Sequence, residues 1–183
     1  MLVYNYAVVS SEVLAQTEAE AARIHQRAGV GILWVNCPLT PKEADQFPAC
    51  QVPLGPTTLS LRILPPSAAE RLRPHMNCFG FALSPDFANV FANDAEQLAQ
   101  RRGMSPGVIL GHVVAHEIGH LLLGVNSHSV NGIMHAPWRP KELEIIGEGR
   151  MAFMPAEAAA MQINVRARIH AAHATEAVVV PGT

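Results

Sequence analysis

One strongly apolar segment, residues 105–124, constrains the fold of this chain more than any other feature. Ser105 is a typical helix N-cap, Pro106 suits the first helical position, and Gly124 favours a helix end. We therefore expect a helix from Pro106 to about Leu123. Its sequence, VILGHVVAHEIGHLLLG, is so apolar that histidines without partners would be costly to bury there.

This helix contains the pattern H-E-x-x-H, formed by His116, Glu117 and His120. Because a helix turns by about 100° per residue, the two histidines lie on one face, one turn apart. Two imidazoles so placed can bind one Zn²⁺, and Glu117 at the flank can act as general base on a water. A catalytic zinc needs three protein ligands and one open position, and His128 can return as the third ligand. The pattern predicts His116, His120 and His128 as metal ligands and Glu117 as the catalytic residue.

The same residues resemble the signature of the metzincin zinc endopeptidases, H-E-x-x-H-x-x-G-x-x-H followed by a methionine turn. Gly124 resembles the family glycine, although it follows His120 by four residues rather than three, and His128 follows by eight rather than six. Met134, in Gly-Ile-Met, resembles the methionine that forms an apolar floor beneath the metal. The resemblance implies a zinc-dependent endopeptidase with one catalytic Zn²⁺ and a peptide or protein substrate.

The resemblance also implies how a substrate binds, extended beside an edge strand above the cleft. The segment from Phe79 to Leu83 is the candidate for this edge, with an ordinary core strand as the alternative. Some metzincins stabilise the oxyanion with a tyrosine after the methionine turn, but the tyrosines of this chain lie within its first six residues. Arg139, His135 or a backbone N–H are the candidates to replace it.

Several alternatives to this site stay open. Asn126 occupies the position where the standard spacing places the third histidine, but asparagine is a poorer zinc ligand than imidazole. A gluzincin-like site would instead use a downstream glutamate, for which Glu142, Glu144 and Glu148 have plausible separations. The chain could also be a non-catalytic metal-binding or protein-binding module, or could hydrolyse an amide other than a peptide.

The remaining histidines lack the spacing of metal ligands. His112, one turn before His116, is expected to be a half-exposed helix residue, with a place in the cleft as the alternative. His135 directly follows Met134 and could contact substrate. The histidines expected at the surface are His25, His75, His170 and His173.

The composition excludes several classes of protein. The 183 residues are 49% hydrophobic and 15% charged, and 13 Lys and Arg against 15 Asp and Glu give a formal net charge of −2. Such a chain lacks the basic face of a nucleic-acid binder and the polarity of a disordered protein. No stretch approaches the roughly 18 uninterrupted apolar residues of a membrane-spanning helix. We expect a globular protein with no nucleic-acid partner and no membrane span, in an oligomeric state left open.

The order of the predicted elements indicates an α+β fold: a single domain with a mixed, twisted β-sheet, an active-site helix and a C-terminal helix. The chain opens with a strand, a helix and a strand, which favours two parallel strands. Gly80, inside a strand, suggests a bulge or a close backbone approach. We assign residues 1–170 to a zinc metallopeptidase-like catalytic domain and residues 171–183 to a C-terminal tail. The expected strands are 3–9, 31–35, 58–64, 79–83 and 90–92, and the expected helices are 11–28, 106–123, 142–146 and 154–170.

The cysteines leave the redox compartment open. Cys37 and Cys50 bracket a proline-rich loop and could form a disulfide, which would leave Cys78 over, whereas three reduced thiols are the equal alternative. No signal peptide is visible at the N-terminus. The metzincin resemblance and the Cys37/Cys50 loop favour an extracytoplasmic or secreted protein, with the cytoplasm as the alternative.

Overall fold

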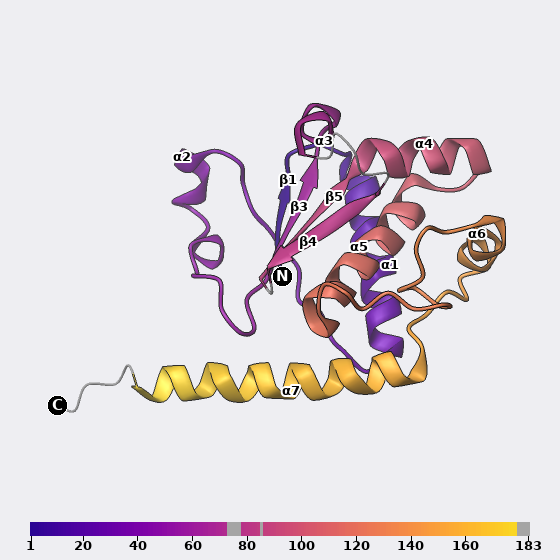
Figure 1. Ribbon diagram of the computed structural model, residues 1–183. Helices are drawn as coiled ribbons and strands as arrows, with labels where there is room; N and C mark the ends of the chain where they lie inside the picture. The colour runs from indigo at the N-terminus through magenta and orange to yellow at the C-terminus, as the bar shows by residue number, and fades with distance from the viewer. Residues whose placement is uncertain (73–77, 85, 179–183) are drawn as a thin grey trace.

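A five-stranded sheet forms the centre of the computed structural model, which describes residues 1–72, 78–84 and 86–178 (Figure 1). The strand order is β2-β1-β3-β5-β4. The first four strands in this order run parallel, and β4 pairs antiparallel with β5 at one edge. The predicted mixed sheet is therefore confirmed. The strands are β1 (Leu2–Asn5), β2 (Val35–Asn36), β3 (Ser60–Leu64), β4 (Gly80–Ser84) and β5 (Phe87–Phe91).

The helices form one large and one small hydrophobic cluster with this sheet. α1 and α5 lie side by side and share the main hydrophobic core with the strands (Figure 1). A second, smaller cluster of Leu64, Ala68 and Phe91 lies under α3. The helices are α1 (Ser11–Arg27), α2 (Pro41–Ala44), α3 (Pro66–Leu72), α4 (Ala92–Arg102), α5 (Pro106–Leu123), α6 (Pro140–Gly147) and α7 (Pro155–Val178), with a short 3₁₀ helix at Pro48–Cys50.

The opening β–α–β unit agrees with the prediction, since β1 and β2 pair in parallel on either side of α1 in the sequence. The hydroxyl of Ser10 accepts a hydrogen bond from the backbone N–H of Val13 and caps α1. β1 is shorter than predicted because the side chain of Asn5 binds both the N–H and the C=O of Val9. These two bonds hold residues 6–9 in a turn before the helix.

α5 runs through the core with the predicted bounds, and nearly all of its residues are buried. Two glycines let it approach α1 closely: an ideal Cβ on Gly107 would lie 2.6 Å from Gln16, and one on Gly111 would lie 2.7 Å from Glu20. By length and composition alone α5 could cross a membrane. Of this window, however, 83% is buried inside the described fold, as in the core helix of a soluble protein, so the observation is weak evidence for a span.

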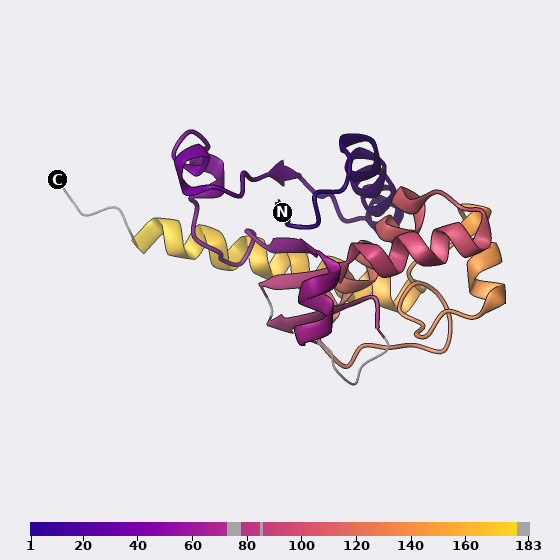
Figure 2. The same cartoon turned by 90° about the horizontal axis from the view of Figure 1, so that it is seen from above.

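α7 is longer than predicted, so the expected helix end near His170 is wrong. The helix extends to Val178, and most of the expected tail, 171–183, is therefore helical, while residues 179–183 lie outside the described part of the chain. The added stretch is rich in alanine, which has the highest helix propensity and needs no packing face to be helical. The C-terminal end of α7 projects beyond the sheet (Figures 1 and 2). His170, just before the added stretch, and His173, within it, are both exposed.

The sequence pattern predicts none of α2, α3 and α4. Residues 90–92 were expected as a separate strand, but β5 already begins at Phe87, and Ala92 starts α4. The buried face of α4 consists of alanines and Leu98, so its hydrophobic periodicity is weak. The helix ends at Gly103, whose φ of +63° favours glycine.

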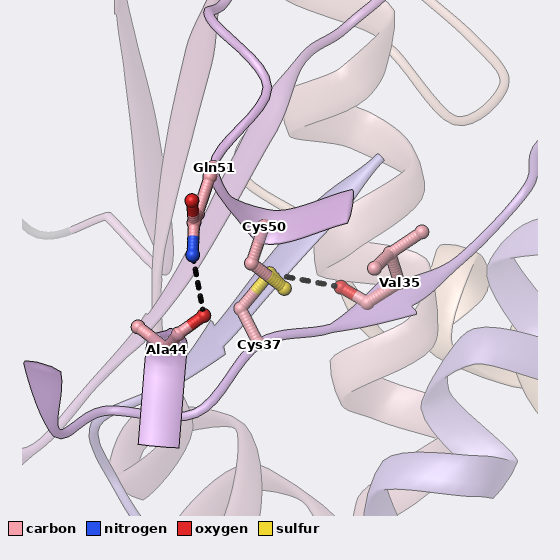
Figure 3. The surroundings of a disulfide bond; sticks show 5 residues. All are labelled: Val35, Cys37, Ala44, Cys50 and Gln51. Carbon is pink, nitrogen blue, oxygen red and sulfur yellow. Dashed lines mark hydrogen bonds between the residues drawn. A yellow bond between two sulfur atoms is a disulfide. The ribbon is translucent and has the colours of Figure 1, made fainter. Parts of the chain in front are cut away.

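A disulfide joins Cys37 to Cys50 and closes the loop that carries α2 (Figure 3). The Cys37 Sγ lies 3.6 Å from the carbonyl oxygen of Val35 in β2, which places the bridge beside the sheet. The side chain of Gln51 also donates to the carbonyl of Ala44 across the loop, over 3.0 Å. The sequence left open a Cys37–Cys50 disulfide or three reduced thiols, and the structure has the disulfide, of which Cys78 is not part.

Candidate metal centre

His116 and His120 lie on the same face of α5, as their spacing predicts. Their Nε2 atoms are 3.0 Å apart, and each side chain is 7% exposed. The helix alone therefore brings two imidazole nitrogens to one point at the edge of the core.

His128 reaches the same point from the irregular segment that follows α5. Gly124 ends the helix with a φ of +104°, which favours glycine, and the chain then turns back. The Nε2 atom of His128 lies 3.2 Å from that of His120, and its ring is exposed. One nitrogen of each histidine lies within 4.8 Å of the other two. The structure thus gathers all three residues that the sequence suggests as ligands.

Hydrogen bonds at Nδ1 determine which nitrogens carry protons. His116 Nδ1 lies 2.7 Å from the carbonyl oxygen of Ile133, which can only accept. His120 Nδ1 lies 3.1 Å from Ser127 Oγ, and that hydroxyl donates to the Gly124 carbonyl over 2.6 Å, so the ring must donate here as well. In neutral rings both Nε2 atoms then carry lone pairs. Two lone pairs at this separation repel each other unless a cation lies between them.

The donor set fits a zinc ion. Zinc binds imidazole nitrogen at about 2.0–2.1 Å in a tetrahedral arrangement, which separates two such nitrogens by about 3.3 Å. The Nε2–Nε2 distances of 3.0 and 3.2 Å are close to this value. The Nδ1–H contacts to backbone carbonyl and hydroxyl groups are those that orient zinc-binding histidines. The cluster is therefore compatible with zinc binding.

Burial keeps the imidazoles of His116 and His120 neutral. It lowers the pKa of His116 to about 4, with smaller contributions from the neighbouring His120 and His128. Burial also lowers the pKa of His120. Both rings are thus unprotonated near neutral pH, which is the form that binds a metal.

Glu117 is buried beside the cluster. Its side chain is 4% exposed, and Oε2 has no hydrogen-bond partner among the described residues. Burial raises the pKa of Glu117 to about 8, so the carboxyl group of the metal-free protein holds a proton at neutral pH. A cation held by the three histidines would favour the carboxylate. A strongly perturbed carboxyl group in a cleft is typical of functional sites.

Met134 packs against α5 within the histidine motif. It is fully buried, and the ideal Cβ of an alanine at position 119 would overlap its Sδ atom. The same Cβ would lie 3.0 Å from Cε1 of Phe153. Gly119 therefore leaves the room that the Met134 side chain occupies beneath the helix.

An open cleft of about 510 Å³ lies over the cluster and is mostly apolar. Trp138 stacks on Phe79 with 6.2 Å between ring centroids and meets the ring of His116 edge-on at 6.4 Å. These aromatic rings form one wall of the cleft. The sequence did not lead us to Trp138 as a residue of the site. The one sign it offers is that Trp138 is a large aromatic residue shortly after Met134.

The strand above the cleft is β4. It lies at the edge of the sheet, and residues 79–82 line the cleft. The expectation that the segment from Phe79 to Leu83 forms the edge is confirmed. One side of β4 pairs with β5, and no other described strand pairs with its outer side.

The alternative ligands lie outside the cluster. Asn126 is exposed, and His135 directs its Nδ1 at a carbonyl of its own loop. None of the three downstream glutamates joins the ligand group that the described residues form. Glu142 instead accepts a hydrogen bond from the backbone N–H of Arg139 at the start of α6, and Glu148 is exposed.

Two other histidines are buried, contrary to expectation. His25 was expected at the surface and His112 half-exposed, yet both are 0% exposed. Each ring lies 2.8 Å by its Nδ1 from a carbonyl four residues earlier, that of Ala21 or Val108. A helix can thus satisfy one nitrogen of a buried imidazole, which the hydrophobic pattern does not reveal. His75 lies outside the described residues.

The fold is similar to the crystal structure of an archaemetzincin from Methanopyrus kandleri, with a TM-score of 0.54 and 16% sequence identity. The match covers 90% of this chain and 94% of that one. No protein-family model and no curated protein matches the sequence. At this identity the likeness shows a shared fold.

Proposed function

We propose that this chain is a zinc-dependent endopeptidase, in which His116, His120 and His128 hold one catalytic Zn²⁺ and Glu117 is the general base. The observation that carries the proposal is the convergence of three imidazole nitrogens beside a buried carboxyl group on an open cleft. The resemblance of the motif to the metzincins and the archaemetzincin-like fold both support it.

Hydrogen bonds orient two of the three proposed ligands without a metal. His116 is fixed by the carbonyl of Ile133 and His120 by the hydroxyl of Ser127, so both direct an unprotonated Nε2 at the same point. Met134 supports the site from below through its contact with α5. When bound, zinc would lower the pKa of a water molecule and polarise the carbonyl of the scissile bond.

Glu117 carries the proton in this reaction. Its carboxylate accepts a proton from the attacking water and delivers it to the leaving nitrogen as the C–N bond breaks. It lines the same cleft as the three histidines, so a carbonyl group bound there would be within its reach. The apolar surroundings of Glu117 strengthen its interaction with charged groups in the site.

The cleft suits an extended peptide. The outer side of β4 can pair with a substrate main chain by β-augmentation, which recognises the backbone rather than a particular sequence. The wall formed by Phe79 and Trp138 would contact an apolar side chain of that substrate. This arrangement supports cleavage within unfolded or extended protein segments.

The Glu117→Ala variant tests the proposal. Wild-type protein loaded with zinc should cleave unstructured proteins, and a chelator should stop the reaction. Glu117→Ala should abolish cleavage while its zinc content stays near one ion per chain, because the three ligands are intact. Loss of zinc together with activity would contradict the role of Glu117. A zinc-loaded wild-type protein that cleaves no peptide or other amide would favour a non-catalytic metal-binding module.

A further inference from the structure

Gly80, the first residue of β4, lies directly against the side chain of Glu117. An ideal Cβ at position 80 would lie 2.8 Å from both Cγ and Oε1 of Glu117 and 2.6 Å from the backbone oxygen of Asn89. Real Cβ atoms essentially never approach other atoms this closely. The space that a side chain at position 80 would fill is therefore occupied by the side chain of Glu117 and by the carbonyl oxygen of Asn89.

The alternation of β4 explains why this space faces α5. Side chains of successive strand residues point to opposite faces of a sheet. Phe81 packs on Phe91 in the cluster under α3, with 5.8 Å between the ring centroids. Gly80 and Ala82 consequently face α5, and both are small enough for the helix to lie close beneath the strand.

The contact has a direct consequence for Glu117. Its side chain has little freedom, since α5 holds its backbone and β4 limits its far end. Its Oε2 has no described hydrogen-bond partner, so packing against position 80, rather than a hydrogen bond to that oxygen, limits where the carboxyl group lies. A methyl group at this position would push the carboxyl group away from the strand.

We propose that Gly80 is a positioning residue for Glu117: its missing side chain forms the recess that holds the carboxyl group beside the three histidines. The kinetic part of this inference rests on the proposed peptidase function. The geometric part, a steric dependence between positions 80 and 117, holds whether or not the protein cleaves peptides.

The kinetic test is the Gly80→Ala variant in the full, zinc-loaded chain. Displacing a catalytic group by about 1 Å can cost about 10²-fold in rate. We expect kcat to fall by about 10- to 100-fold, with KM changed little and zinc content unchanged, because the atoms nearest to the added methyl group belong to Glu117 and Asn89 and not to a histidine ligand. The matched control is Gly31→Ala, since an ideal Cβ there meets nothing within 4 Å. A Gly80→Ala enzyme with unchanged kcat, or with a change in KM alone, would overturn the proposal.

The second test uses thermal unfolding and needs no activity. Gly80→Ala should lower Tm in both backgrounds, because the close approach to the Asn89 carbonyl oxygen remains, but by less in the Glu117→Ala background, where the facing side chain has been removed. An equal loss of Tm in both backgrounds would place the clash at the Asn89 carbonyl and refute the recess. Should Gly80→Ala fail to fold, folding of the double variant would support the proposal, and failure of both would overturn it. If the wild-type protein cleaves nothing, the proposed function fails. The comparison of Tm values in the two backgrounds then decides by itself whether Gly80 positions Glu117.

Discussion

The Nδ1 atom of His116 lies 2.7 Å from the carbonyl oxygen of Ile133, 17 residues further along the chain. The N–H of Ile133 in turn donates to the carbonyl of Ala152 over 2.9 Å. These bonds connect α5 to the segment that contains Met134. The orientation of His116 therefore depends on the position of the segment after α5, and metal binding at His116 should stabilise that segment as well.

His128→Ala should weaken zinc binding more strongly than any change outside the ligand set. Removing it leaves two imidazoles as ligands. Loss of a group that only orients a ligand lowers metal affinity by up to about 100-fold, so we expect loss of a ligand itself to lower it by at least that factor. Competition with a chromophoric chelator measures this. Asn126→Ala is the matched control, because Asn126 is exposed and stands where the standard metzincin spacing would place the ligand. The reverse result, with Asn126 essential and His128 dispensable, would contradict the assignment.

Ser127→Ala should weaken zinc binding without removing a ligand. The hydroxyl of Ser127 accepts a hydrogen bond from Nδ1–H of His120 and donates one to the Gly124 carbonyl. Loss of such an orienting group typically lowers metal affinity by about 10- to 100-fold. Ser127→Thr retains the hydroxyl and should remain close to the wild type in the same chelator competition. Identical affinities for all three proteins would show that Ser127 does not orient His120.

The sequence predicts the parts of the site that depend on local geometry. Ser105, Pro106 and Gly124 predict the bounds of α5, although the hydroxyl of Ser105 binds Gln16 instead of capping the helix. The pairing of His116 with His120 follows from helical periodicity alone. His128 could be suggested because a glycine turn close to the helix end allows the chain to return. Its altered spacing is accommodated by the turn at Gly124, which does not depend on an exact residue count.

Features that depend on packing between distant segments could not be predicted. The recess at Gly80 exists only because β4 lies over Glu117, and a lone strand glycine is equally compatible with a bulge. Trp138 joins the cleft through its stack on Phe79, 59 residues earlier in the chain. The burial of His25 likewise results from the packing of α1 against the core. The polar sequence of α1 does not indicate that this histidine faces the core.

Gly119→Ala should destabilise the fold, although alanine normally stabilises a helix. The added methyl group would overlap Sδ of Met134 and crowd Phe153, and overpacking of this kind typically costs about 1–3 kcal/mol. Denaturant unfolding of the metal-free protein measures this. The control is Gly147→Ala in α6, where the nearest atom, Cε of Met104, lies at an ordinary 3.7 Å. That change should be neutral or stabilise by up to about 1 kcal/mol. Equal effects at both positions would argue against close packing of Met134 under α5.

Reducing the Cys37–Cys50 disulfide should destabilise the protein without releasing zinc. A bridge that closes a loop of this length, with a sequence separation of 13, contributes about 3 kcal/mol on the chain-entropy account. Intact mass before and after reduction tests for the bridge, and unfolding with and without reductant tests its effect. The double variant Cys37→Ser/Cys50→Ser should be less stable and insensitive to reductant. Sensitivity of that variant to reductant would assign the effect to a disulfide between the Cys78 residues of two chains.

Acidification should destabilise the protein partly through His25. Burial lowers the pKa of His25 to about 4 in the folded protein, whereas an unfolded histidine has a pKa of about 6.5. Because the unfolded chain binds the proton more readily, the contribution of His25 to stability is complete above about pH 6.5. It declines as the pH falls towards 4 and is lost below that value. The total change is about 3 kcal/mol.

The His25→Leu variant isolates this contribution. Leucine fills a similar buried volume and leaves no Nε2 without a partner, so the variant should lose less stability than wild type between pH 6.5 and 4. Urea unfolding of the metal-free proteins at several pH values measures the stability of both. Subtracting one profile from the other cancels the contributions of the metal-site histidines, because both proteins contain them. The control, His170→Leu, changes an exposed ring and should follow the wild-type profile. Parallel profiles for His25→Leu and wild type would show that His25 is readily protonated in the folded state.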